Sequence, residues 1–247
     1  MFIVSNQEFP SLRANKRVQH LYYKRVLFLL SSLVFLLSAT FTTTASGQQQ
    51  KRKQILIMFE GADVPLNLGR GDARQLAMLL GHFDVDYKLE AMQAYKPGDL
   101  FNYDIGFFIG FSKKYDPPDR FLKDVFAARK QFVWMNTGFD RFSERYDVSS
   151  KFGFRFASFD TASVFDIVRS NGKTFTKGEQ NLNIISITNS DQVEVLATAY
   201  STGKRKEESY ILRSGNFMYI ADSPFAEATE TDRYLLFADM LHDILGE

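Results

Sequence analysis

The hydrophobic pattern of this chain predicts buried strands that alternate with amphipathic helices. Apolar runs without polar breaks are typical of strands covered on both faces of a parallel sheet, and such runs lie at 54–59, 103–110, 132–135 and 217–221. The segment 84–91 alternates apolar and polar residues, which indicates a strand near a sheet edge. Apolar residues at helical spacing predict helices at about 71–83, 119–130 and 231–245.

The pattern changes between residues 151 and 213. Phenylalanines alternate over 151–159, and Asn171-Gly172 lies between two short apolar runs, as in a tight β-hairpin. We read 151–213 as a β-rich insertion packed against the sheet. The predicted fold class is therefore α/β: an open, mostly parallel sheet of the flavodoxin or class I glutamine amidotransferase type, with helices on both faces.

The first 47 residues have the organisation of an export signal. A basic segment at 1–25 precedes an apolar run at 26–39 and a tail of small residues that ends at Gly47. We expect a signal peptide at 1–47, a linker at 48–53 and a single domain at 54–247, exported to the periplasm or the exterior. An uncleaved signal-anchor is the alternative, and it would be the only contact with the membrane.

Charge and cysteine content exclude several functions. Residues 1–47 hold five of the 30 basic residues and one of the 29 acidic ones, so the remainder carries 25 basic and 28 acidic side chains. This remainder lacks the excess of positive charge that nucleic-acid binding requires. The chain contains no cysteine, which excludes disulfides and thiol chemistry.

Several short motifs, spread over most of the chain, carry a resemblance to a known family: Leu79-Leu80-Gly81-His82-Phe83, Tyr95-Lys96-Pro97-Gly98, Phe132-Val133-Trp134 and Tyr219-Ile220-Ala221-Asp222-Ser223-Pro224-Phe225. With these motifs the chain resembles the amino-terminal region of exported proteins related to polysaccharide deacetylases. The resemblance, over about 54–245, implies an amidotransferase-like α/β fold. In that family a deacetylase module would follow, whereas this sequence stops at Glu247. It therefore implies an accessory domain, with a polysaccharide or a separate deacetylase as its partner.

The residues that catalysis would need are missing from the expected places. The turn after 132–135 has the position of a nucleophile elbow, but it holds Asn136 and Thr137 and not serine or cysteine. We interpret it as a turn that caps the next helix. Beyond residue 47 the histidines are His82 and His242, too few and too far apart for a typical catalytic metal site. We expect no metal, no cofactor and no catalytic residue.

A binding site remains as a hypothesis. Ligands of open α/β sheets bind at the carboxyl ends of the strands, and the polar residues expected to line a crevice there are Glu60, Asp63, Ser112, Asn136, Thr137 and Asp222. We expect a non-catalytic exported module that assists polysaccharide or cell-envelope metabolism. Two alternatives stay open: an unrecognised hydrolase that uses carboxylates such as Glu60, Asp63 or Asp222, and a structural partner of a separate deacetylase.

Overall fold

The computed structural model describes residues 51–61, 68–177, 182–223, 225 and 231–246. Arg52–Glu247 forms one compact unit. Its α-helices are α2 (Leu68–Leu80), α3 (Asp119–Ala127), α4 (Phe139–Arg145), α5 (Val148–Phe152) and α6 (Thr231–Leu245). Its strands are β1 (Lys53–Phe59), β2 (Val85–Ala91), β3 (Ile105–Ile109), β4 (Gln131–Met135), β5 (Phe154–Asp160), β6 (Ile167–Ser170), β7 (Lys173–Thr176), β8 (Leu182–Ile187), β9 (Glu194–Ser201), β10 (Lys206–Ser214) and β11 (Phe217–Ile220).

In the described part of the chain, nine strands form one mixed sheet in the order β2-β1-β3-β4-β11-β10-β9-β6-β7. The strands from β2 to β11 are parallel. Those from β11 to β7 pair antiparallel with their neighbours. The expectation of an open, mostly parallel sheet of the flavodoxin type is therefore wrong, because half of this sheet is antiparallel.

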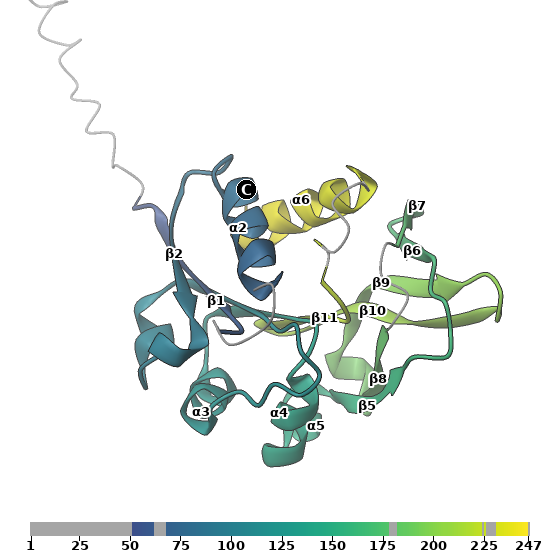
Figure 1. Ribbon diagram of the computed structural model, residues 1–247, viewed down its shortest axis with the longest axis horizontal. Coiled ribbons are helices and arrows are strands. Elements are labelled where there is room, and N and C mark those ends of the chain that lie inside the picture. Colours follow the sequence, from purple (N-terminus) through teal and green to yellow (C-terminus); the bar gives the residue numbers. More distant parts are fainter. Residues whose placement is uncertain (1–50, 62–67, 178–181, 224, 226–230, 247) are drawn as a thin grey trace, which may run out of the picture. The chain divides into compact units, whose positions relative to one another are not determined.

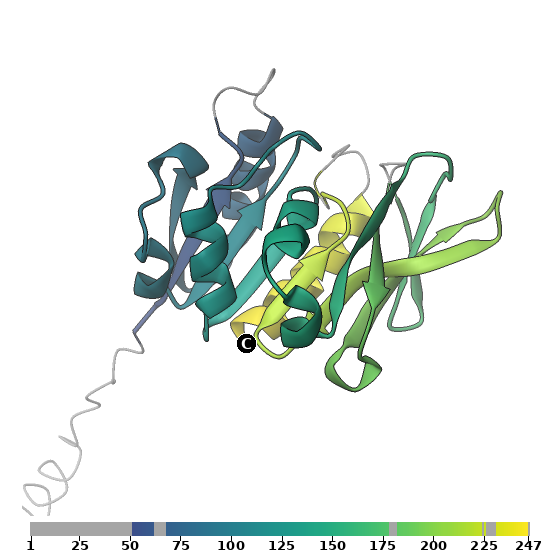
Figure 2. The same cartoon turned by 90° about the horizontal axis from the view of Figure 1, so that it is seen from below.

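The inner parallel strands are buried for the reason that their sequences suggested, whereas β2 at the end of the strand order is largely exposed. Every residue of β3 and β11 is buried, and β1 is buried from Ile55 to Phe59. Helices cover these strands from both sides, with α2 and α6 on one face and α3, α4 and α5 on the other (Figures 1 and 2). A strand with helices on both faces can be apolar throughout, which explains the uninterrupted runs.

Aromatic rings fill the layer between the sheet and the α4–α5 side. Trp134 of β4 stacks on Phe142 of α4, with ring centroids 5.4 Å apart. Phe217 of β11 stacks on Phe152 of α5 at 4.3 Å. The indole N–H of Trp134 donates a hydrogen bond to the Thr137 carbonyl at 3.0 Å. This packing ties the turn after β4 to the core.

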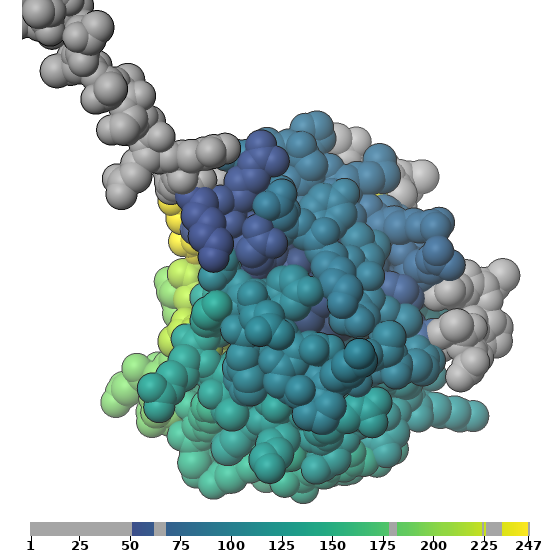
Figure 3. Space-filling model, turned by 90° about the vertical axis from the view of Figure 1, so that its left-hand side faces the viewer, coloured from purple at the N-terminus to yellow at the C-terminus, as the bar shows by residue number. Residues whose placement is uncertain are grey.

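The β-rich region is not a separate insertion packed on the sheet. Its strands β6, β7, β9 and β10 extend the main sheet, while β5 and β8 form a two-stranded sheet of their own. The predicted hairpin at Asn171-Gly172 is confirmed, since β6 and β7 pair antiparallel and both turn residues have positive φ, 49° and 73°. Strands β2 and β7 lie at the two ends of the strand order, and Figure 3 views the molecule from the β2 side.

The described residues contain no helix that is both long and apolar enough to cross a membrane. The predicted export signal at 1–47 and the linker residues 48–50 lie outside the described residues.

Candidate functional site

The carboxyl ends of the parallel strands lie side by side at one end of the strands. We call the residues that follow β1, β3, β4 and β11 there the carboxyl edge. Glu60 follows β1, Ser112 lies in the loop after β3, Asn136 and Thr137 follow β4, and Asp222 follows β11. Neighbouring strands in the order β1-β3-β4-β11 therefore carry five of the six predicted crevice residues. The sixth, Asp63, lies outside the described residues.

Glu60 connects the ends of β1 and β3. Its side chain is only 2% exposed. Its Oε2 accepts hydrogen bonds from the backbone N–H groups of Phe111 at 2.7 Å and Ser112 at 2.6 Å. Burial raises the pKa of the Glu60 carboxyl, and the two N–H donors partly oppose this rise because they stabilise the anion. Glu60 therefore fixes the loop after β3 and does not reach into solvent.

The turn after β4 is held in place by its neighbours. Asn136 has φ 66°, a left-handed conformation that asparagine tolerates better than most residues. Its side-chain oxygen accepts a hydrogen bond from Asn183 at 3.3 Å, and its carbonyl accepts one from the Tyr219 hydroxyl at 3.1 Å. Gly110 at the end of β3 lies against this turn, because a Cβ there would approach the Thr137 carbonyl to 2.2 Å.

Two oxygens beside this turn are buried without a hydrogen bond. Within the part of the chain that the structure describes, the Thr137 hydroxyl and Oδ1 of Asp140 in α4 have no hydrogen-bond partner. Burial raises the pKa of Asp140. The sequence did not single out Asp140, because one acidic residue in the first turn of a helix is common.

Asp222 lies in a buried ionic cluster that the sequence did not predict. Its Oδ2 is 2.7 Å from Nζ of Lys177, and both side chains are almost fully buried, 2% and 0% exposed. Its Oδ1 accepts a hydrogen bond from the Tyr210 hydroxyl. Lys177 directly follows β7 and Tyr210 lies on β10. Because the fold brings these two segments to Asp222, no local pattern could have revealed this cluster.

Further contacts join the loop after β11 to the rest of the edge. The Ser223 hydroxyl donates a hydrogen bond to Oδ2 of Asp72 in α2. Burial, together with the charges of Asp140 and Asp222, raises the pKa of the Tyr219 hydroxyl, which bonds to Asn136. Asn136 thus bonds to Tyr219, and Asp222 bonds to Tyr210 and Lys177. Glu60 and Ser112 bond to each other at the β1–β3 boundary.

The histidines of the described residues take no part in this edge. The ring of His242 packs edge-on against Phe83 with centroids 4.9 Å apart, and His82 is exposed just beyond α2. Among the described residues there is no group of three or more histidine, cysteine, aspartate or glutamate side chains that could hold a metal ion.

Comparisons with known proteins give a fold and no family. No protein-family model matches the chain, and no curated protein sequence matches it. A solved structure of a ThuA-like protein from Bacteroides uniformis superposes with a TM-score of 0.53 and 12% identity, over 76% of this chain and 90% of that one. The alpha-L-fucosidase isoenzyme 2 from Paenibacillus thiaminolyticus gives a TM-score of 0.53 and 13% identity.

The second match covers 77% of this chain but only 33% of the fucosidase chain. At these identities the likeness concerns the fold alone. The ThuA-like neighbour supports the amidotransferase-like fold that the sequence resemblance implied. Neither comparison by sequence supports the finer assignment to a deacetylase-related family.

Proposed function

We propose that this chain is a non-catalytic exported domain that binds or assists in polysaccharide or cell-envelope metabolism. The observation that carries the proposal is the state of the carboxyl edge. Glu60 is bonded to two backbone amides, and Asp222 is bonded to Lys177 and Tyr210. A general acid or base must reach the proton that it transfers. These carboxylates are buried and engaged in holding the fold together.

The link to carbohydrate rests on two supports of different kinds. One is the resemblance to exported proteins related to polysaccharide deacetylases. The other is the fold shared with a protein named as an alpha-L-fucosidase. Export rests on the organisation of residues 1–47, in which a basic segment precedes an apolar one.

The test is an activity and binding screen of the purified full chain. We expect no release of acetate from acetylated oligosaccharides and no hydrolysis of glutamine, together with retention on at least one insoluble or immobilised polysaccharide. Turnover that disappears in Thr137→Ala would refute the non-catalytic proposal, because Thr137 occupies the elbow position. Absence of retention on any polysaccharide would refute the carbohydrate link.

One observation favours a second candidate, a hydrolase that uses buried carboxylates. Burial raises the pKa of Glu60, and a raised carboxyl pKa is what a general acid needs at neutral pH. If this candidate is right, Glu60→Gln and Asp222→Asn each lower turnover of an oligosaccharide substrate by about a hundredfold or more. The matched control is Glu144→Gln, since Glu144 is 61% exposed on α4. If Glu60→Gln and Asp222→Asn turn over the substrate at the same rate as the parent and Glu144→Gln, the hydrolase is excluded.

A third candidate is docking on a separate deacetylase, and exposed apolar side chains favour it. Met78 of α2 is 73% exposed and Leu235 of α6 is 57% exposed. These two helices are adjacent, because Tyr234 of α6 hydrogen-bonds to Gln75 of α2. We expect Met78→Lys with Leu235→Lys to abolish co-purification with such an enzyme, whereas Val195→Lys, at an exposed apolar position on β9, leaves it intact.

A further inference from the structure

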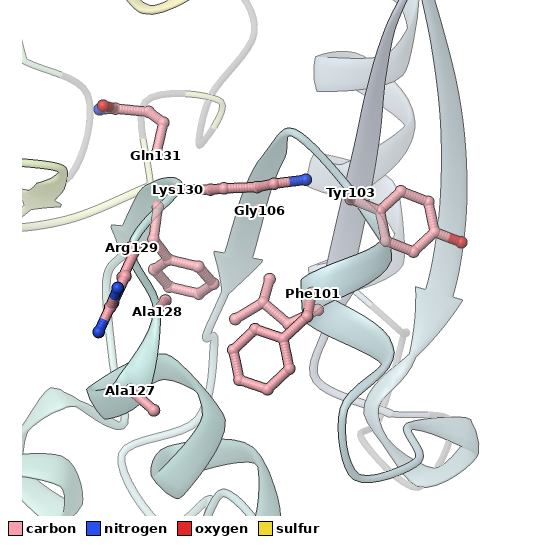
Figure 4. Close-up of a pocket in the computed structure, with 10 residues that line it drawn as sticks. Phe101, Tyr103, Gly106, Ala127, Ala128, Arg129, Lys130 and Gln131 are labelled. Carbon is pink, nitrogen blue, oxygen red and sulfur yellow. The ribbon is translucent and has the colours of Figure 1, made fainter.

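A cavity of about 320 Å³ opens at the amino ends of β3 and β4, at the opposite ends of these strands from the carboxyl edge. This volume lies at the lower end of the range for small-molecule sites. We call it the amino-end cavity, and its lining includes Leu100, Phe101, Gly106, Ala128, Lys130 and Phe132. Figure 4 shows it with these side chains as sticks.

The bottom of the amino-end cavity is apolar. Leu100 and Phe132 are buried and close over Gly106, where a Cβ would come within 2.5 Å of Leu100 Cδ1 and 2.7 Å of Phe132 Cδ2. Ala128 is also buried, while the ring of Phe101 is 47% exposed. An exposed aromatic ring beside a buried apolar floor offers a flat surface for another ring.

One wall of the cavity is fixed before any ligand arrives. Leu100 and Phe101 belong to the short 3₁₀ helix η3 (Asp99–Asn102). The segment before this helix is anchored to α3 by Asp124, whose Oδ2 accepts hydrogen bonds from the Tyr95 hydroxyl and the Gly98 N–H, both at 2.6 Å. A preformed wall reduces the entropy that a ligand loses on binding.

A single lysine supplies positive charge over this apolar space. Lys130 extends across Gly106 toward Tyr103, while Arg129 and Gln131 point away (Figure 4). The ammonium of Lys130 is 3.3 Å from Oδ1 of Asp104, and both side chains are about half exposed, 52% and 45%. Exposed pairs of this kind contribute little to stability, because water screens both charges. The Gln54 backbone N–H donates to Oδ2 of Asp104 at 3.0 Å, so Asp104 stays bonded if Lys130 turns to a ligand.

We propose that the amino-end cavity binds a small organic anion: a flat apolar ring that lies against Phe101 and Phe132 and carries one carboxylate that pairs with Lys130. The apolar lining selects the ring, and Lys130 selects the charge. This site is separate from the carboxyl edge and does not depend on the function proposed above.

The probe is 2-naphthoate, titrated into the full chain by isothermal calorimetry at low salt. Its matched neutral analogue is 2-naphthalenemethanol. We expect naphthoate to bind about tenfold more tightly than the alcohol, because a charge-assisted hydrogen bond to Lys130 is lost with the alcohol. Absence of naphthoate binding at millimolar concentration, or equal affinity for the two probes, would overturn the proposal.

Variants locate the site. Lys130→Gln should weaken naphthoate about tenfold and leave the alcohol unchanged, and Phe101→Ala should weaken both probes about fivefold or more. The controls are Lys123→Gln, an exposed lysine of α3 outside the lining, and Tyr87→Ala, a ring of similar exposure (44%) on β2. Lys130 and Phe101 are both partly exposed, so the thermal unfolding temperatures of Lys130→Gln and Phe101→Ala should match that of the parent. Unchanged naphthoate affinity in Lys130→Gln would refute the assignment.

Discussion

The two ends of the parallel strands differ in how their space is used. At the carboxyl edge, polar side chains are buried and bonded to one another, as in the contact of Asp222 with Lys177. At the amino ends, small residues such as Gly106 and Ala128 border an open apolar space. A glycine allows close packing at both ends, but Gly110 admits a backbone carbonyl and Gly106 admits side chains. The described polar residues that suggest chemistry are thus buried and bonded, whereas the amino-end cavity lies beside small and apolar residues that suggest little chemistry.

The strongest test of the closed carboxyl edge is Asp222→Ala. This change removes the carboxylate that pairs with the buried Lys177 ammonium, and we expect a loss of about 3–5 kcal/mol in the free energy of unfolding. Urea denaturation followed by circular dichroism measures it. The control is the double variant Asp222→Leu with Lys177→Met, which should recover much of the loss because neither charge remains. A loss below about 1 kcal/mol in the single variant would show that the pair is not a stabilising part of this edge.

Asp124→Ala tests whether the cavity wall is preformed. It leaves the buried Tyr95 hydroxyl and the Gly98 N–H without their acceptor, and we expect a loss of about 1–3 kcal/mol in unfolding free energy. The same variant should weaken 2-naphthoate because η3 is no longer anchored. Combining it with Tyr95→Phe should cost less than the sum of the single losses, since the two groups share one hydrogen bond. Additive losses would contradict this coupling.

Glu60→Gln should have a smaller effect on the free energy of unfolding, and this effect should depend on pH. Burial raises the pKa of folded Glu60 above its ordinary value of 4.5. The folded chain therefore binds the proton more tightly than the unfolded chain does. The stability from this group is fully present below pH 4.5 and is lost as pH rises through the folded pKa.

Unfolding free energies between pH 4 and pH 8 measure this contribution. The parent should lose more stability over the rise above pH 4.5 than Glu60→Gln does, and Glu144→Gln should behave as the parent. Identical slopes for the parent and Glu60→Gln would contradict the raised pKa.

The smallest effect is expected at the open end. Lys130→Gln removes a surface ion pair with Asp104, and exposed substitutions of this kind change stability by about 0.5 kcal/mol or less. Thermal unfolding measures it, with Lys123→Gln beside it. A loss above about 2 kcal/mol would mean that Lys130 supports the fold. The two ends of the strands would then no longer differ in how much their charged side chains stabilise the protein.

The sequence predicted the buried parallel strands well because each of them is an apolar run that can be recognised without knowing its neighbours. The runs at 54–59 and 103–110 correspond to β1 and β3, and the helix predicted at 231–245 matches α6. Such runs identify a strand without naming its partner. The antiparallel pairing of β10 with β11, which turned a parallel sheet into a mixed one, depends on contacts that the local pattern does not encode.

The candidate site was predictable only as a location. Chain order placed Glu60, Asn136 and Asp222 after three parallel strands, and the structure brings the ends of those strands to one edge. Asp222 is held by Lys177 and Tyr210 and Asn136 by Asn183, all from the β-rich region. Glu60 is held by backbone N–H groups of the loop after β3. The predicted crevice residues therefore have partners that only the tertiary fold supplies. The amino-end cavity had no signal in sequence, since alanine and glycine carry no chemistry of their own.

The strand order also bears on solubility. A sheet whose outermost strands present unpaired backbone groups can recruit a second chain and aggregate. Here β2, at one end, carries exposed charges at Asp86 and Lys88, and Arg52 forms ion pairs with Asp84 at 2.7 Å and with Asp86 at 3.7 Å. At the other end β7 is only four residues long. Charge on one outermost strand and the short length of the other discourage intermolecular strand pairing, so a protein of this design can remain dispersed at high local concentration.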